Sequence, residues 1–194
     1  MISIVTAVAT EPVTLDEAKT FLRFSSGVFA DDEVEDFLIQ SLIVAAREYC
    51  ENVTSRALAP QTVDALYDGF PRDRQIEIPR PPLTSVEWVK YKDSAGTETT
   101  MTENTDYIVD KESDVGRIVL PYGASWPSFT PYPVHPVKIR FIAGYTAAPK
   151  QIRQAMLLLI GHWHLNREAT GDASGQIAFS VNALLAQYKV RWFG

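Results

Sequence analysis

Three histidines, at positions 135, 162 and 164, are the side chains best suited to metal binding or proton transfer in this chain of 194 residues. His162 and His164 lie two positions apart on a predicted helix. This spacing puts them roughly 200° apart around its axis, so the two rings cannot bind one metal from the same face. His164 and Glu168 have a usable i, i+4 spacing, but a third ligand is missing from the sequence nearby. We therefore expect no metal site, and histidines that are packed or hydrogen-bonded.

The other reactive residues also lack a catalytic arrangement. Cys50 lies on the apolar face of a predicted helix, which is typical of a small core residue. The acidic residues from Asp31 to Asp36 lack the ligand pattern of a calcium loop, and they stand at a helix start, where the helix dipole favours carboxylates. No phosphate-binding, dinucleotide-binding or nucleophile-elbow motif occurs. We expect no enzyme, no catalytic residue, no metal and no cofactor; a small hydrolase is the least favoured alternative.

The charge of the chain changes sign along its length, within a total of −6. Residues 1–60 carry four basic and ten acidic side chains, residues 61–148 nine and twelve, and residues 149–194 five and two. An acidic front and a basic back suit head-to-tail association better than duplex binding, which normally needs a strong basic patch. Solvated surfaces with a chance skew explain the charges equally well. A nucleic-acid-binding module stays an alternative, with short basic groups at residues 72–74 and 90–92.

Two helices are predicted near the N-terminus. Thr14 and Glu17 form a capping box that starts the first helix. The second runs from about Asp31 to Val53, and its apolar residues cover about half of its circumference, more than an ordinary surface helix needs. Phe37 and Val44 stand outside that surface, in the polar arc. A helix this apolar must be covered on more than one side, either by its own fold or by neighbouring subunits.

From Gln61 the apolar pattern changes to a period of two, and nine of the twelve prolines fall between Pro71 and Pro136. A third helix begins near Pro149 and is buried nearly all round, because residues 156–160 are all apolar. The predicted strands are Ile76–Ile78, Val86–Tyr91, Tyr107–Val109, Arg117–Leu120 and Val137–Phe141. The fold class predicted is α+β, a helical bundle with an inserted antiparallel β-rich block. Its parts are N-terminal helices (1–60), the β-rich insertion (61–147), a buried helix completing the core (148–175) and a C-terminal docking segment (176–194).

The C-terminal tail concentrates aromatic and basic side chains, the composition of interface anchors. These residues are Tyr188, Lys189, Arg191, Trp192 and Phe193. A docking tail is slightly preferred over a tail that folds back on its own domain.

Composition and cysteine usage indicate where the chain works. The single cysteine can form no internal disulfide, and no apolar run approaches the ~20 residues that span a bilayer. The N-terminus lacks the basic flank and long apolar core of a signal peptide. We expect an intracellular, soluble protein with no membrane partner.

Short motifs spread over almost the whole chain resemble, in their order, one protein family. It is the head-to-tail connector (adaptor) family of long-tailed bacteriophages and phage-derived gene transfer agents. The matching pieces are Val13–Lys19, Leu22-Arg23, Asp31-Asp32, Ala45–Glu48, Thr54–Leu58, Pro60–Thr62, Ile76–Leu83, Gly123–Pro127, Phe141–Tyr145, Leu158–Trp163 and Asn166–Ala169.

The resemblance implies a structural role with no enzymatic residues. It implies a homo-oligomeric ring of about twelve copies beneath the portal of the DNA-filled head, joining head to tail and lining the DNA channel. The partners implied are the portal protein, a tail-side connector or stopper protein, and DNA that passes without sequence-specific binding. The location implied is the neck of a virion assembled in the bacterial cytoplasm.

Two physical features fit that resemblance. A closed ring uses heterologous interfaces, for which the wide apolar surface of the second helix and the exposed Phe37 and Val44 are candidates. A net-negative subunit suits a passage through which DNA slides, because phosphate binding scales with neutralising cations. Since the C-terminal segment of related adaptors reaches the portal, the resemblance implies that residues 176–194 dock there, with Trp192 and Phe193 as anchors.

Overall fold

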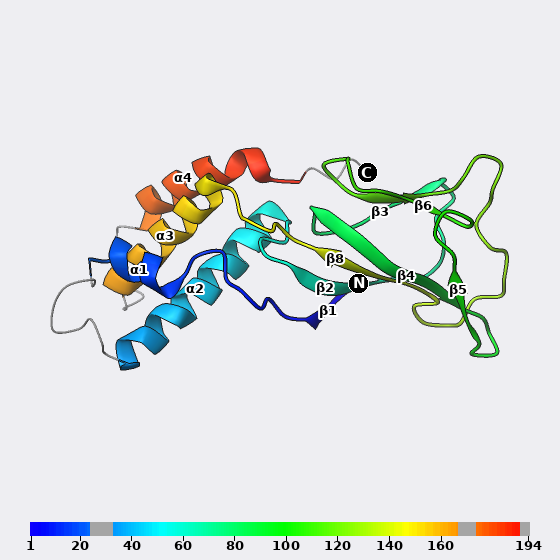
Figure 1. Cartoon of the computed structure of the whole chain (residues 1–194), viewed down its shortest axis with the longest axis horizontal. Helices are drawn as coiled ribbons and strands as arrows, with labels where there is room; N and C mark the ends of the chain where they lie inside the picture. The colour runs from blue at the N-terminus through cyan, green and yellow to red at the C-terminus, as the bar shows by residue number, and fades with distance from the viewer. Residues whose placement is uncertain (24–32, 167–173, 191–194) are drawn as a thin grey trace. The chain divides into compact units, whose positions relative to one another are not determined.

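The computed structural model describes residues 1–23, 33–166 and 174–190. The chain divides into two compact units, a β unit (residues 1–9 and 60–145) and a helical unit (residues 10–59 and 146–194) (Figure 1). The described residues form four α-helices and two antiparallel sheets. The predicted α+β fold class is therefore confirmed.

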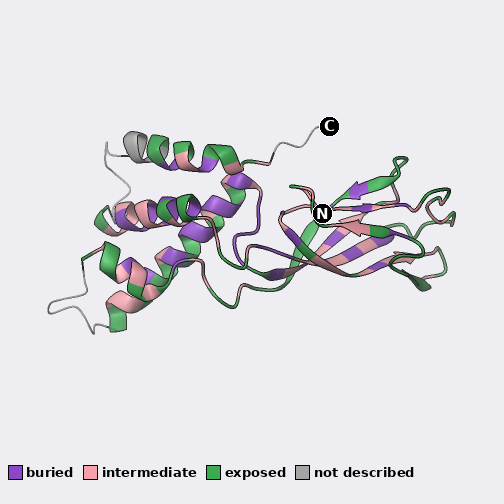
Figure 2. Cartoon of the chain, turned by 45° about the horizontal axis from the view of Figure 1, so that its top comes forward, coloured by how far each residue is buried: buried purple, intermediate pink, exposed green. Residues whose placement is uncertain are grey.

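The helical unit is built from α1 (Leu15–Phe21), α2 (Glu33–Thr54), α3 (Lys150–Leu165) and α4 (Ser174–Leu185), which a short 3₁₀ turn follows at Ala186–Tyr188. α3 packs against both α2 and α4 and runs antiparallel to them, so α2 and α4 run in the same direction (Figure 1). Buried residues line the helix sides that face the interior of the unit (Figure 2). The apolar run of α3 supplies much of this core, with Ile152, Met156 and Ile160 fully buried.

The capping box predicted for α1 is present. The Thr14 hydroxyl accepts a hydrogen bond from the Glu17 amide at 3.2 Å, and the Glu17 carboxylate accepts one from the Thr14 amide at 3.0 Å. Glu17 also pairs with Arg153 of α3, and these partners lower the pKa of its carboxyl. Phe21 lies over Gly161 of α3, where a Cβ would stand 3.1 Å from the phenyl ring. α1 is thus fastened to α3 at both of its ends.

The β unit holds both sheets. The five-stranded sheet has the order β1 (Ile2–Thr6), β2 (Gln61–Tyr67), β8 (Val137–Ala143), β4 (Leu83–Lys92) and β5 (Glu98–Met101). The smaller sheet has the order β3 (Gln75–Glu77), β7 (Arg117–Val119) and β6 (Ile108–Asp110). Burial alternates along β2 and β8, the period-two pattern of strands with one face in the core.

Three features differ from the sequence expectation. Residues 1–9, which we expected with the N-terminal helices, belong to the β unit because β1 pairs with β2. Strands β1, β2 and β5 are absent from the predicted strands, although the period-two pattern was expected from Gln61 onward, and the full length of α4 was not predicted. Every residue of β1 is exposed, so this edge strand lacks the buried face that gives a strong sequence signal.

In the described part of the chain, no helix combines the length and apolar character needed to cross a membrane.

Candidate assembly surfaces

The outer side of α2 carries a stripe of exposed side chains. Phe37, Ser41, Val44 and Glu48 follow one another at i, i+4, i+7 and i+11, which puts them on one face of the helix. Phe37 is 73% exposed and Val44 is 37% exposed. The buried apolar residues lie on roughly the opposite side of the helix: Ile39, Ile43, Ala46 and Cys50. The two predicted interface residues therefore share one open face, and their role stays a prediction.

The fold covers only part of the wide apolar surface of α2. Tyr49 makes an edge-to-face contact with Trp163 of α3, with ring centroids 6.2 Å apart, and it is half-buried. Leu38 and Leu42 are half-buried as well. Val34, in the first turn of the helix, is exposed. The chain's own fold covers the inner side of α2. The outer side is exposed and could contact another molecule.

The helical spacing of α2 puts Arg47 and Glu51 in the same polar arc as Phe37 and Val44, but the structure buries both. Arg47 is 8% exposed and Glu51 is 3% exposed. The Arg47 guanidinium donates to the Glu51 carboxylate and to the Glu11 carboxylate, each at 2.9 Å. The second Glu51 oxygen accepts the Leu58 amide at 2.9 Å. Through this network, α2 is bonded both to Glu11, in the segment before α1, and to Leu58, in the segment that follows α2. An Arg and a Glu four residues apart were the only sequence signal for it.

Two of the three histidines, His162 and His164, are engaged in structural contacts. His164 bonds to the Glu35 carboxylate on α2, and His162 bonds to the Asn166 side chain. Glu168, the second ligand considered with His164, lies outside the described residues. Among the residues that the structure describes, no three His, Cys, Asp or Glu side chains gather as a metal site would require. Burial, with a contribution from Glu51, raises the pKa of the Cys50 thiol to about 12, so it stays protonated and is a poor nucleophile.

Of the four cations in the two short basic groups considered for nucleic-acid binding, Arg72 is exposed and the other three contact other residues of the β unit. Arg74 donates to the carbonyls of Ala124 and Pro121, and Lys90 lies over the Trp88 ring, 4.8 Å from its centroid. Lys92 lies over the Tyr132 ring at 4.2 Å. Cation–aromatic contacts and carbonyl bonds of this kind hold the side chains in place. These three cations therefore contribute to the structure of the β unit and are less available for binding phosphates.

The beginning of the C-terminal tail lies against the helical unit. The Arg56 Nε donates to the Tyr188 carbonyl at 2.6 Å, and the Tyr188 hydroxyl donates to the Gln151 side chain at 2.9 Å. The Val190 amide donates to the Thr54 carbonyl at 3.0 Å. Lys189 between them is exposed. Of the tail residues predicted to dock, Arg191, Trp192 and Phe193 lie outside the described residues.

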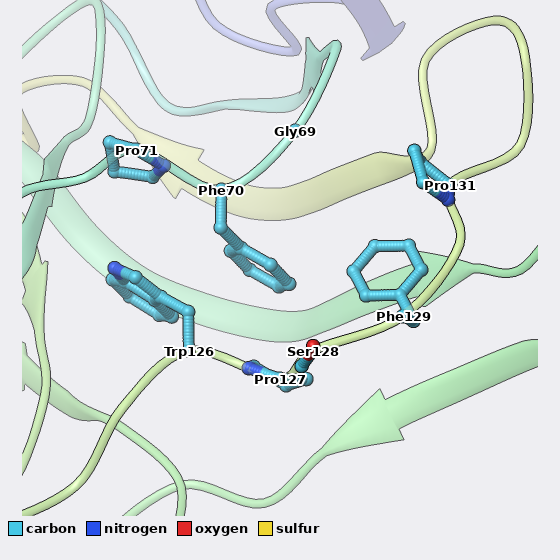
Figure 3. Close-up of a pocket in the computed structure, with 8 residues that line it drawn as sticks. All are labelled: Gly69, Phe70, Pro71, Trp126, Pro127, Ser128, Phe129 and Pro131. Carbon is cyan, nitrogen blue, oxygen red and sulfur yellow. The ribbon is translucent and has the colours of Figure 1, made fainter.

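An open pocket of about 360 Å³ lies in the β unit and is walled by aromatic and proline side chains. Phe70 stacks on Trp126 with centroids 4.9 Å apart and meets Phe129 edge-on (Figure 3). The Trp126 indole donates to the Asp73 carbonyl at 2.7 Å. The full lining is Gly69, Phe70, Pro71, Trp126, Pro127, Ser128, Phe129 and Pro131. This lining contains no acidic or basic side chain. The aromatic contacts across the pocket therefore suit holding residues 126–131 against Phe70 better than they suit catalysis.

Comparisons with known proteins found whole-chain likeness at the level of structure. No protein-family model and no curated protein matches the sequence. A chain in the neck of an empty gene transfer agent (GTA) particle computed with C6 symmetry matches with a TM-score of 0.83 and 26% identity. A chain of the virion of a native GTA particle matches with a TM-score of 0.81 and 27% identity. A chain from the neck of a native GTA particle computed with C12 symmetry has a TM-score of 0.78 and 24% identity, and it shows likeness of fold alone. Each match covers 100% of this chain and 98% of the other.

Proposed function

We propose that this chain is a structural protein of the neck of a phage-like particle, of the kind that gene transfer agents carry. The observation that carries the proposal is the structural likeness over the whole chain, at 26% and 27% identity, to two chains of such particles. The likeness spans the helical unit and the β unit together. If the likeness reflected only a common small fold, it would be expected to cover one of the two units and not both.

In the finer form of the proposal, about twelve copies form a ring that joins the portal of the DNA-filled head to the tail and lines the DNA channel. The neck assemblies that resemble this chain were computed with C6 and C12 symmetry, which is compatible with such a ring. The further partners are the portal protein and a tail-side connector or stopper protein. A closed ring requires two different faces on each copy, and the open face of α2 is a candidate for one of them.

The electrostatics of the chain suit a passage for DNA. The net charge is −6, and Arg74, Lys90 and Lys92 have partners within the β unit. A net-negative chain repels DNA, and cations that are held in contacts within the protein are less available to phosphates, so DNA can move without being held. We expect the chain to elute from immobilised DNA at low salt. Retention that falls steeply with salt, with a slope of several charges, would favour the nucleic-acid-binding alternative.

Portal docking by the C-terminal tail is part of the proposal. Tyr188 is bonded to its own helical unit, so the residues beyond it, with Trp192 and Phe193, are the proposed anchors, and the exposed Lys189 stands beside them. Deletion of residues 191–194 should leave the circular dichroism spectrum and ring formation unchanged and abolish binding to the portal. Unchanged portal affinity would remove the tail from the proposal.

The test of lateral association uses the open face of α2. Phe37→Asp and Val44→Asp place a carboxylate on a surface that is already exposed, so both variants should fold but form fewer rings. Ile108→Asp is the matched control, because Ile108 is an exposed apolar residue of β6, a strand of the β unit. Negative-stain imaging counts the rings. If Phe37→Asp and Val44→Asp assemble as well as Ile108→Asp, the face is wrongly assigned.

A further inference from the structure

The outer side of α4 carries an exposed stripe of its own. Phe179 and Ala183 lie on α4 at i and i+4, Ala186 follows at i+7 in the 3₁₀ turn, and Lys189 ends that turn with an extended backbone. Phe179 is 77% exposed. The buried residues Val181 and Leu185 point to roughly the opposite side, toward the interior of the unit. A large aromatic ring left open on a helix whose other side is buried marks a second contact surface.

The stripes of α2 and α4 resemble each other in the order of their side chains. Each begins with an exposed Phe and continues with a small residue four positions later, Ser41 on α2 and Ala183 on α4. At i+7 the stripe of α2 presents Val44 and that of α4 presents Ala186, a larger side chain opposite a smaller one. With the stripes aligned in this order, the small residues Ser41 and Ala183 allow the two helices to approach closely, and the two Phe rings meet at one end.

The charges at the ends of the two stripes are opposite. Glu48 stands about 16 Å from Phe37 along the axis of α2, at 1.5 Å per residue. Lys189 stands about 17 Å from Phe179, counting the helix and the 3₁₀ turn that continues it. The Glu48 carboxylate is 3.6 Å from Arg47 and is still 61% exposed, so it can face a further cation. Lys189 is exposed as well.

We propose that the α2 stripe (Phe37, Ser41, Val44, Glu48) of one copy packs against the α4 stripe (Phe179, Ala183, Ala186, Lys189) of a second copy. Within a copy, α2 and α4 run in the same direction (Figure 1). Copies in a ring are related by rotation about the ring axis. If that axis is roughly parallel to these helices, α2 of one copy and α4 of its neighbour meet in parallel. In that alignment Phe37 meets Phe179 and Glu48 meets Lys189. The contact is heterologous, because each copy uses one stripe on each side. This inference rests on the proposed ring and names the two faces that build it.

Site-specific disulfide trapping tests the contact without disturbing the two Phe anchors. Ser41→Cys and Ala183→Cys are made in separate chains, one of them tagged, and the chains are mixed with oxidised glutathione. We expect the mixed 41–183 disulfide to exceed both the 41–41 and the 183–183 products roughly tenfold, because only facing thiols have the geometry to bridge. Gln154→Cys, at an exposed position of α3, is the matched control and should cross-link poorly with either. The native Cys50 is buried and adds no background.

The outcomes separate the two proposals. If the mixed disulfide is no more abundant than the Gln154→Cys products, the α2–α4 contact is wrong, whether or not rings form. If rings form on the portal without the mixed disulfide, the proposed neck function stands and only this interface fails. If the mixed disulfide forms but no ring ever binds a portal, the interface stands and the proposed function fails. Glu48→Lys and Lys189→Glu should each lower the 41–183 yield, and the double exchange in one chain should restore it.

Discussion

Glu51 connects Arg47 to the Leu58 amide at the end of α2, so its removal should strongly destabilise the helical unit. In Glu51→Ala the buried Arg47 loses one of its two close carboxylate partners and the Leu58 amide loses its acceptor. Breaking a buried ion pair from one side costs about 3–5 kcal/mol, and an unsatisfied buried amide costs about 1–3 kcal/mol. The two effects share one side chain and do not add fully. Since Glu11 still pairs with Arg47, we expect a loss of about 3–5 kcal/mol in total.

Urea unfolding followed by circular dichroism at the helix band measures this loss, because the helical unit contains all four described α-helices. With a slope of about 2 kcal/mol per molar urea, the midpoint should fall by about 2 M. Glu51→Gln keeps an oxygen for the Leu58 amide and loses only the charge, so it should cost about 1–3 kcal/mol and remain measurable if the Ala variant does not fold.

Glu48→Gln is the matched control for Glu51→Gln. It removes the same charge three residues away on the same helix, from a side chain that is 61% exposed and 3.6 Å from Arg47. Exposed pairs contribute less than about 1 kcal/mol, so the midpoint should hardly move. Equal shifts for the two Gln variants would refute the claim that burial of the network is what makes Glu51 matter.

Three further predictions concern a helix cap, a buried thiol and a turn. Thr14→Ala removes one half of the capping box of α1 and should cost about 1 kcal/mol in the same urea titration; no change would mean that the cap is redundant. The Cys50 thiol, with its pKa raised to about 12, should react with an aromatic disulfide reagent at pH 8 more than about 100-fold slower in the folded chain than in urea, and equal rates would contradict its burial. Hydrogen bonds from Ser113 and Arg117 lower the pKa of Asp110 to about 2 from 3.8, so its stabilising effect is present above pH ~4 and is lost as the pH falls toward 2. Asp110→Asn should accordingly lower the thermal midpoint much more at pH 7 than at pH 2, and equal differences at the two pH values would contradict this assignment.

The sequence was most informative where local physics decides the structure. The Thr14–Glu17 capping box, the apolar periodicity of α2 and the apolar run of α3 each predicted a helix that is present. All five predicted strands overlap observed ones, because alternation and proline-marked ends are local signals. These signals also predicted that the strand-rich block interrupts the helical part of the chain.

Features that depend on long-range pairing were not predictable in the same way. β1 is an edge strand with every residue exposed, and its partner β2 lies some sixty positions along the chain. Arg47 and Glu51 look like ordinary surface residues until Glu11 and the Leu58 amide are brought to them by the fold. The stripe on α4 was missed because Ala183 and Ala186 give little hydrophobic signal, so only the structure shows which side of the helix remains open.

The proposed neck function is tested most directly by electron microscopy of the purified full chain mixed with the portal protein of the same particle. The account predicts closed rings of about twelve copies seated coaxially on the portal, with a central opening wide enough for duplex DNA. A chain that stays monomeric at all concentrations, and that leaves the portal bare, would contradict it.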